Sequence, residues 1–264
     1  MANEYFIDAY SDIGNKKKVN QDALIVKQAR SSKIGRVCFA CLCDGMGGLS
    51  QGEIASASFI NRMGQWFQTD FPQLLNSPSD ETEDLSGNST SYNSYWRSVE
   101  NQWEQICKQI NQGLGQYGSE NGIKLGTTAV ALLVIGDEYL VMSVGDSRAY
   151  KIDKRSLEQI THDQSYVQQQ MDLGRMTPEE AAVSSQKSVL LQCIGASANV
   201  YPDFFRGKLE RKNRILLCSD GLWRLLKSDE IIKYTAQRDG IKKMSEIVMR
   251  RGETDNISGV VIGV

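Results

Sequence analysis

The feature that most constrains the fold is a set of short apolar runs, rich in Val, Ile and Leu and bounded by Gly, Asp or Asn. They comprise residues 36–43, 128–135, 139–144, 214–218 and 257–264. Short runs of this composition between turn-forming residues are typical of buried β-strands. Only short turns, at Gly136-Asp137 and at Gly145-Asp146-Ser147, interrupt the chain between 130 and 152. This spacing predicts an antiparallel meander, because parallel strands need longer crossovers.

Helical patterns lie between these runs. Ser50-Gln51-Gly52-Glu53 has capping-box spacing and is followed by apolar residues at helical intervals. A second helix is predicted over about 93–117. Further helix starts are expected at 177–180, where Pro takes the first helical position, and at 228–230, where acidic residues favour the helix dipole. Strands and helices in this order predict an α+β fold with sheets at the centre and helices outside.

The length of 264 residues fits one sandwich-like unit, so we expect a single domain over 1–264. Within it, residues 69–95 are polar and rich in Ser, Thr and Asn, which predicts an exposed connection between two helices.

Composition narrows the functional classes. Thirty basic and thirty-two acidic residues leave a net charge of −2, without the basic field of a nucleic-acid-binding domain. No apolar run approaches the roughly 18 residues of a membrane span, and the first residues, MANEYFIDAY, lack the features of a signal peptide. We therefore expect a cytoplasmic protein that binds neither nucleic acid nor membrane.

Six cysteines are present: Cys38, Cys41, Cys43, Cys107, Cys193 and Cys218. Cys38 and Cys41 have redox or zinc spacing, but alternation along a strand would turn them to opposite faces. No second pair completes a zinc set. Buried free thiols are the prediction.

Acidic residues flank the apolar segments. They are Asp22, Asp44, Asp146, Asp220 and Asp255. Any one of them could be a turn residue, because Asp-Gly is a common turn pair. If the strand ends converge, however, the carboxylates would repel one another and raise their own pKa values unless a cation neutralised them. Oxygen ligands select Mg²⁺ or Mn²⁺ over zinc or copper, and the single histidine, His162, is expected in an exposed loop.

The glycines after Asp44 suit such a site. Without a Cβ, Gly45 lets its carbonyl approach a cation, and Gly47 and Gly48 admit a bulky substrate. A phosphate-cradling nucleotide loop is the alternative, but G-x-G-x-x-G is not matched and no Gly-Lys-Ser/Thr follows.

Taken in order, the motifs resemble those of the metal-dependent type-2C (PPM) serine/threonine protein phosphatases, particularly compact bacterial members. The motifs are Ser11-Asp12-Ile13-Gly14, Asn20-Gln21-Asp22, Asp44-Gly45-Met46-Gly47-Gly48, Gly126-Thr127-Thr128-Ala129, Val144-Gly145-Asp146-Ser147-Arg148, Cys218-Ser219-Asp220-Gly221 and Asp255-Asn256. The resemblance implies two stacked antiparallel β-sheets flanked by helices, with a metal centre at one end. It also implies a variable flap over 164–200, for which a packed helical hairpin is the alternative.

The resemblance further implies a role for each acidic residue. Asp44 would bridge two Mn²⁺ or Mg²⁺ ions, with Asp220 and Asp255 completing one site. Asp22 and the Gly45 carbonyl would serve the other site. Asp146 resembles the ligand of a weaker third ion shared with Asp220, and Asn256 a residue that orients its neighbours.

The implied reaction is hydrolysis of phosphoserine and phosphothreonine by a metal-bridging hydroxide, without a phosphoenzyme. The implied partners are phosphorylated proteins, clients of a cognate serine/threonine kinase, and the protein is expected to be a monomer. A non-catalytic phosphoprotein-binding relative and a hydrolase of small phosphate esters or nucleotides are the alternatives.

Two positions depart from the family pattern. Family members usually carry a phosphate-clamping arginine before the Asn-x-Asp motif, where this chain has Lys17. Lysine is a point charge without a bidentate fork, and its neighbours Lys16 and Lys18 also fit a solvated basic patch. Some members carry histidine in or after the glycine motif, where this chain has Met46 and Leu49, so the proton donor is unassigned.

Overall fold

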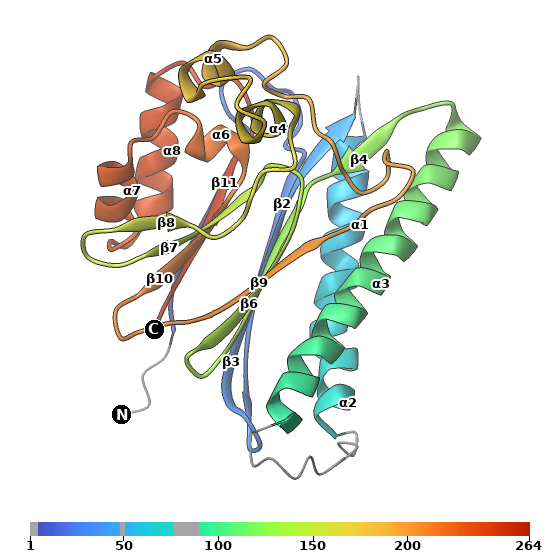
Figure 1. Ribbon diagram of the computed structural model, residues 1–264, viewed down its shortest axis with the longest axis vertical. Helices are drawn as coiled ribbons and strands as arrows, with labels where there is room; N and C mark the ends of the chain where they lie inside the picture. The colour runs from blue at the N-terminus through green and yellow to red at the C-terminus, as the bar shows by residue number, and fades with distance from the viewer. Residues whose placement is uncertain (1–4, 48–50, 77–89) are drawn as a thin grey trace.

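The computed structural model describes residues 5–47, 51–76 and 90–264. Two antiparallel β-sheets pack against each other, and helices cover the outer face of each (Figure 1). This arrangement confirms the predicted α+β sandwich.

In the described chain, the strands are divided between a five-stranded and a six-stranded sheet. The first sheet has the order β1 (Phe6–Asp12), β11 (Ile257–Gly263), β10 (Arg214–Cys218), β7 (Arg148–Ile152) and β8 (Leu157–Gln159). The second has the order β2 (Asp22–Ser31), β3 (Gly35–Gly47), β5 (Ala129–Ile135), β6 (Glu138–Val144) and β9 (Asp203–Lys208), with β4 (Leu125–Thr127) paired to β3. All five apolar runs are therefore strands.

The predicted meander over 130–152 is only half correct. Strands β5 and β6 form the expected antiparallel hairpin, but β7 lies in the other sheet, where it pairs with β10. The chain changes sheets at Gly145, whose φ of +96° is in the left-handed region. Asp146 therefore lies where the chain passes from one sheet to the other.

Strand β3 forms the centre of the sandwich through its alternating side chains. Cys38, Ala40 and Leu42 pack in the core between the sheets. Phe39 and Cys41 pack in a second core beneath the helices. Cys38 and Cys41 thus face opposite ways, as predicted, and all six cysteines are buried and free.

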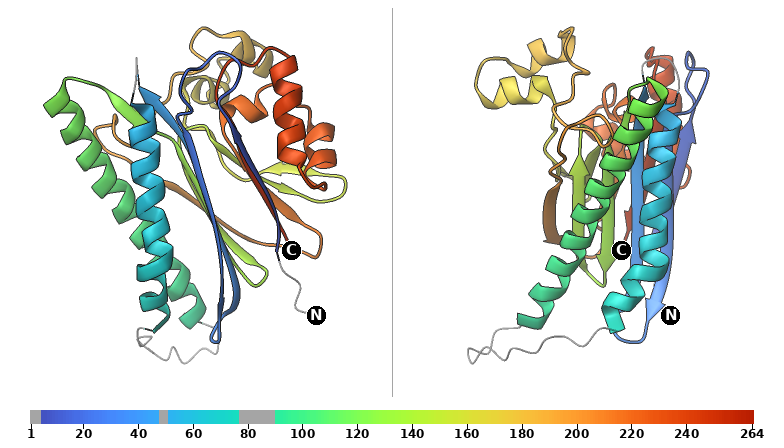
Figure 2. Two further views of the ribbon diagram at one scale, coloured as in Figure 1. Left: turned by 180° about the vertical axis from the view of Figure 1, so that it is seen from behind. Right: turned by 90° about the vertical axis from the view of Figure 1, so that its right-hand side faces the viewer.

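Helices cover each sheet on its outer side (Figure 2). Over the second sheet lie α1 (Gly52–Gln65), η1 (Trp66–Asp70), α2 (Phe71–Asn76) and α3 (Thr90–Asn121). Over the first lie α6 (Asp220–Trp223), α7 (Ser228–Tyr234) and α8 (Gly240–Arg250). Within the described ranges, no helix has both the length and the apolarity that crossing a membrane requires.

The described part of the 69–95 segment is more ordered than its composition predicts. The chain stays helical through η1 and α2, because the buried Phe71 stacks on Phe67 with ring centroids 5.7 Å apart. Helix α3 begins at Thr90, three residues before the predicted start. The rest of the predicted connection, 77–89, lies outside the described residues, as does Ser50 of the predicted capping box.

Residues 164–200 contain two short helices, α4 (Tyr166–Asp172) and α5 (Pro178–Val183). They stand out from the same end of the sandwich that carries β4 (Figures 1 and 2). The predicted start of α5 is confirmed, since Thr177 and Glu180 form a reciprocal capping box. The segment carries exposed apolar side chains, among them Leu173 and Val183.

Candidate metal centre

Asp22 and Asp44 lie opposite each other in the register of β2 and β3. Asp44 does not end its strand as predicted. Strand β3 continues to Gly47 and pairs there with β4, because Thr127 and Thr128 hold the backbone of Asp44. The Thr127 hydroxyl donates to the Asp44 carbonyl at 3.0 Å, and the Asp44 N–H donates to Thr128 Oγ1 at 3.0 Å.

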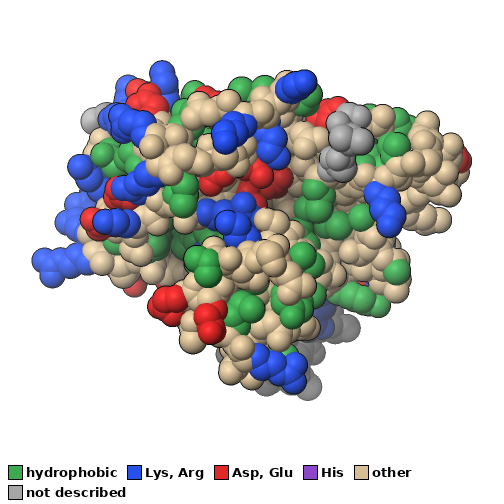
Figure 3. Space-filling view, turned by 90° about the horizontal axis from the view of Figure 1, so that it is seen from above, with side chains coloured by type: hydrophobic (Ala, Val, Ile, Leu, Met, Phe, Trp, Pro, Cys, Tyr) green, Lys and Arg blue, Asp and Glu red, His purple; other side chains and the backbone are tan. Residues whose placement is uncertain are grey.

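The first sheet contributes its carboxylates from the ends of neighbouring strands. Asp220 follows β10 and begins α6, while Asp255 precedes β11 by two residues. A hydrogen bond of 2.9 Å from the Ser219 hydroxyl to Asp22 Oδ2 joins this edge to the second sheet. Figure 3 views the molecule from above relative to Figure 1. In this view, acidic side chains lie in a hollow with Lys and Arg side chains around them.

These carboxylates influence one another strongly. Burial raises the pKa of Asp22 to about 7, and the charges of Asp220 and Asp255 add to that effect. Burial and the Asp220 charge likewise raise the pKa of Asp146 to about 7. The pKa of Asp44 lies well above its ordinary value, through desolvation first and then through the other four carboxylates. The structure therefore brings all five predicted acidic residues into one electrostatic cluster.

Two side-chain cations partly neutralise the cluster. Lys17 Nζ lies 2.7 Å from Asp255 Oδ1. Arg224 Nη2 forms an ion pair with Asp220 and lies 3.9 Å from Asp146 Oδ2. In the described part of the chain, no three or more His, Cys, Asp or Glu side chains are grouped as a ready-made metal shell. The assignment of individual aspartates as metal ligands therefore stays a prediction.

The donor set nevertheless fits a hard cation. Within the described residues, Asp22 Oδ1 and Asp220 Oδ1 are buried without a hydrogen-bond partner. An unsatisfied buried carboxylate oxygen is costly, and a divalent cation with a preference for oxygen ligands would relieve that cost. Gly45 is required for a reason that the sequence did not show: a Cβ there would lie 2.2 Å from the Gly52 carbonyl oxygen.

Asn256 connects the loop before β2 to the start of β11. Its Oδ1 accepts a hydrogen bond from the Gln21 N–H at 2.9 Å. Its Nδ2 donates to the carbonyls of Ile13 and Val19, at 2.9 and 3.1 Å. Because Asn256 is buried, these bonds fix the loop that carries Lys17 and leads to Asp22.

The sequence did not single out Arg224 or the threonine pair for these contacts. Arg224 stands four residues after Asp220, the spacing of a helical ion pair, which could have identified it. His162 is exposed as expected, and its Nε2 lies 2.8 Å from Asp172 Oδ2.

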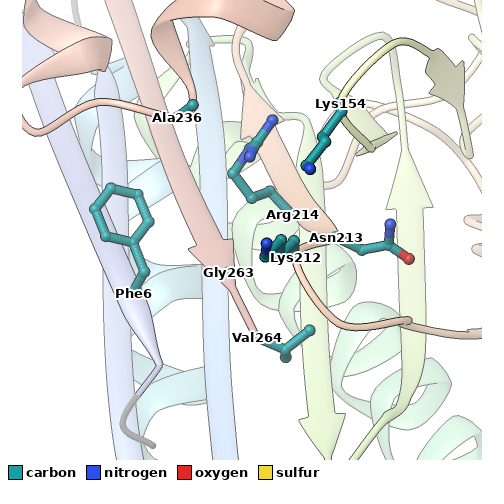
Figure 4. A pocket seen from close by; sticks show the side chains of 8 residues that line it. All are labelled: Phe6, Lys154, Lys212, Asn213, Arg214, Ala236, Gly263 and Val264. Atoms are coloured by element: carbon teal, nitrogen blue, oxygen red, sulfur yellow. The ribbon is translucent and has the colours of Figure 1, made fainter.

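A groove of about 500 Å³ lies elsewhere, at the far ends of β10 and β11 from Asp220 and Asp255 (Figure 4). Its lining includes the cationic side chains of Lys154, Lys212 and Arg214. The groove is therefore separate from the carboxylate cluster.

The fold and the cluster define a metal-dependent phosphatase of the 2C type. The chain belongs to the protein phosphatase 2C family, whose model matches residues 14–257. It is 29% identical to Protein phosphatase PhpP of Streptococcus pneumoniae over 98% of this chain and 97% of that protein.

Solved structures agree with this assignment. The serine/threonine phosphatase of S. agalactiae superposes with a TM-score of 0.81 at 28% identity, over 99% of this chain and 100% of that one. The catalytic domain of PstP, solved in complex with 2 manganese ions, superposes with a TM-score of 0.71 at 26% identity, over 98% of this chain and 97% of that one.

The raised pKa values predict how stability depends on pH in metal-free protein. A carboxyl whose pKa is raised on folding binds its proton more tightly in the folded state, so its contribution is present near pH 4 and lost as the pH rises through about 7. In EDTA, the free energy of unfolding from urea titrations should fall between about pH 4 and pH 7, the ordinary and the raised pKa of these carboxyls. Asp22→Asn should reduce this fall, whereas Asp137→Asn, at an exposed hairpin position, should not. An unchanged slope for Asp22→Asn would contradict the clustering of these charges.

Proposed function

We propose that this chain hydrolyses phosphoserine and phosphothreonine in proteins, using two divalent cations, Mn²⁺ or Mg²⁺. The observation that carries the proposal is the carboxylate cluster with its partnerless buried oxygens, built from both sheets of a protein phosphatase 2C fold. The relatives support the substrate class, since they are named as serine/threonine phosphatases. The PstP structure with 2 manganese ions supports the number of core ions.

The acidic residues and the Gly45 carbonyl would bind the two ions as follows. Asp44 would contact both ions, Asp220 and Asp255 would hold one, and Asp22 with the Gly45 carbonyl would hold the other. When bound, such ions lower the pKa of water and offset the charge of a phosphoryl group. The chain itself keeps the ligands in place through the threonine pair at Asp44, Ser219 at Asp22 and Asn256 at the loop between β1 and β2.

A cysteine phosphoenzyme does not fit this chain. Burial raises the pKa of Cys38 to about 12. Burial also raises the pKa of Cys218, and the nearby charges of Asp163 and Asp220 raise it further. A buried thiol of raised pKa is a poor nucleophile. We therefore propose direct hydrolysis without a covalent intermediate.

We also propose that the substrates are clients of a cognate serine/threonine kinase, that residues 1–264 form one domain and that the protein acts as a cytoplasmic monomer. Free thiols at all six cysteines support a reducing compartment. The coverage of 97% of PhpP supports one catalytic unit over residues 1–264.

Metal removal and Asp44→Asn test the central proposal. Phosphate release from a phosphothreonine peptide should need Mn²⁺ and should fall at least about a hundredfold in EDTA or in Asp44→Asn, because charge stabilisation at the phosphoryl group is lost. Asp137→Asn should retain the activity of the unmodified protein.

Activity that survives EDTA would contradict this proposal. Retention of the phosphopeptide in Mn²⁺ without phosphate release would favour a non-catalytic binding protein instead. Faster turnover of nucleotides than of phosphopeptides would favour a small-molecule phosphatase.

Lys17 is proposed to contact the phosphate of the substrate. Its ammonium group is on an exposed loop beside Asp255, within reach of the cluster. At saturating Mn²⁺, Lys17→Ala should raise KM for the phosphopeptide about tenfold, as expected for a lost charge-assisted hydrogen bond. Lys17→Arg should preserve or lower KM, and Lys16→Ala and Lys18→Ala are matched controls. Equal kinetics for all three alanine variants would reduce Lys17 to part of a solvated patch.

Residues 164–200 are proposed to be a mobile flap beside the site. Exposed apolar side chains and the short helices α4 and α5 support this proposal, since mobile loops often control substrate access. Limited proteolysis should cleave the chain between α4 and α5 sooner without Mn²⁺ and phosphopeptide than with them. Equal protection in both conditions would favour a helical pair that is firmly packed.

A further inference from the structure

Arg224 lies between two carboxylates that the family resemblance assigns to a third metal ion. Its Nη2 forms an ion pair with Asp220 and lies 3.9 Å from Asp146 Oδ2. One guanidinium group is thus placed where an ion shared by Asp146 and Asp220 would need to bind. Arginine does not lose its proton in proteins, so this positive charge is permanent.

The surroundings of Arg224 hold it in this position. Its backbone N–H donates to the Asp220 carbonyl at 3.1 Å, at the end of α6. The preceding residue, Trp223, donates from Nε1 to the Asp146 carbonyl at 3.2 Å, and the Arg148 guanidinium lies 3.3 Å from the Trp223 ring centroid. Trp223 and Arg224 therefore hold Asp146 by its backbone and by its carboxylate.

The charge balance also favours the arginine. The side chain of Arg224 is only 18% exposed, and four carboxylates act on it: Asp220, Asp146, Glu253 and Asp255. A divalent ion would have to lie about 2.0–2.6 Å from the oxygens of its ligands. A guanidinium in contact with one carboxylate and near the other competes for that space and repels the ion through its own charge.

We propose that Arg224 is a built-in cation that replaces the third metal ion, so that this chain binds two divalent ions and not three. The inference rests on the proposed function for the two core ions, and it differs from the sequence-based expectation for Asp146. Arg224 also joins the site to residues 164–200, because its Nη2 donates to Ser188 Oγ at 3.4 Å. Loading of a weak third ion therefore does not control this enzyme.

Manganese stoichiometry tests the inference independently of activity. Titration of EDTA-treated and then desalted protein with Mn²⁺, followed by the EPR signal of free Mn²⁺ up to millimolar concentrations, should give two bound ions per chain. Arg224→Ala should bind three, because Asp146 and Asp220 lose their cation. The double variant Arg224→Ala/Asp146→Asn should return to two.

Two further variants serve as controls. Arg251→Ala removes an arginine that pairs with Glu230, outside the cluster, and should keep two ions. Arg224→Lys retains the charge and should also keep two. A far-UV circular dichroism spectrum matching the unmodified protein establishes that each variant is folded.

The results separate this inference from the proposed function. Three ions in the unmodified protein, or two in folded Arg224→Ala, would overturn the role of Arg224 and leave the two core ions intact. Fewer than two ions in the unmodified protein would contradict the proposed function and this inference together.

Discussion

The repulsion among the carboxylates at one end of the sandwich is the constraint on which the rest of the site depends. Asp22, Asp44, Asp146 and Asp220 each have a raised pKa, first because they are desolvated and then because neighbouring carboxylates act on them. Arg224 partly relieves this effect at Asp146 and Asp220. Either bound protons or cations must offset this charge in the folded protein. The sandwich can hold the cluster because the bond from Ser219 to Asp22 fixes one sheet edge to the other.

Close backbone approach is the second requirement, and it explains where glycine occurs. At Gly221 a Cβ would lie 2.2 Å from the Asn256 carbonyl oxygen, and at Gly14 a Cβ would lie 2.2 Å from that of Asp255. The segment that carries Asp255 can therefore approach the segment of Asp220 and the loop after β1 only because these side chains are missing. The glycines of the motifs thus allow the loops to pack together, in addition to any approach they give to a cation or substrate.

Sequence reasoning identified the buried strands and the acidic residues, because both leave strong local patterns. It did not assign strands such as β1, β2 and β9, whose side chains are partly exposed and so lack a continuous apolar run. The passage from β6 to β7 was misassigned because a short turn can connect strands of one sheet or of two. Arg224 was missed because ion pairs four residues apart are common on exposed helices and usually contribute little, and only the tertiary structure shows Asp146 on its other side.

The two cations of the cluster differ in how readily they can give up their carboxylates. Lys17 is 40% exposed, lies on a loop and has a flexible stem, so under the proposed function Asp255 would exchange it for a divalent ion at little structural cost. Once released, Lys17 would be free to meet the phosphate of a substrate. Arg224 is more buried and is held by Asp220, by Ser188 and by the anchored Trp223 beside it. Removing it would leave two buried carboxylates without their cation, so under the two proposals the cluster would accept ions beside Lys17 and resist them beside Arg224.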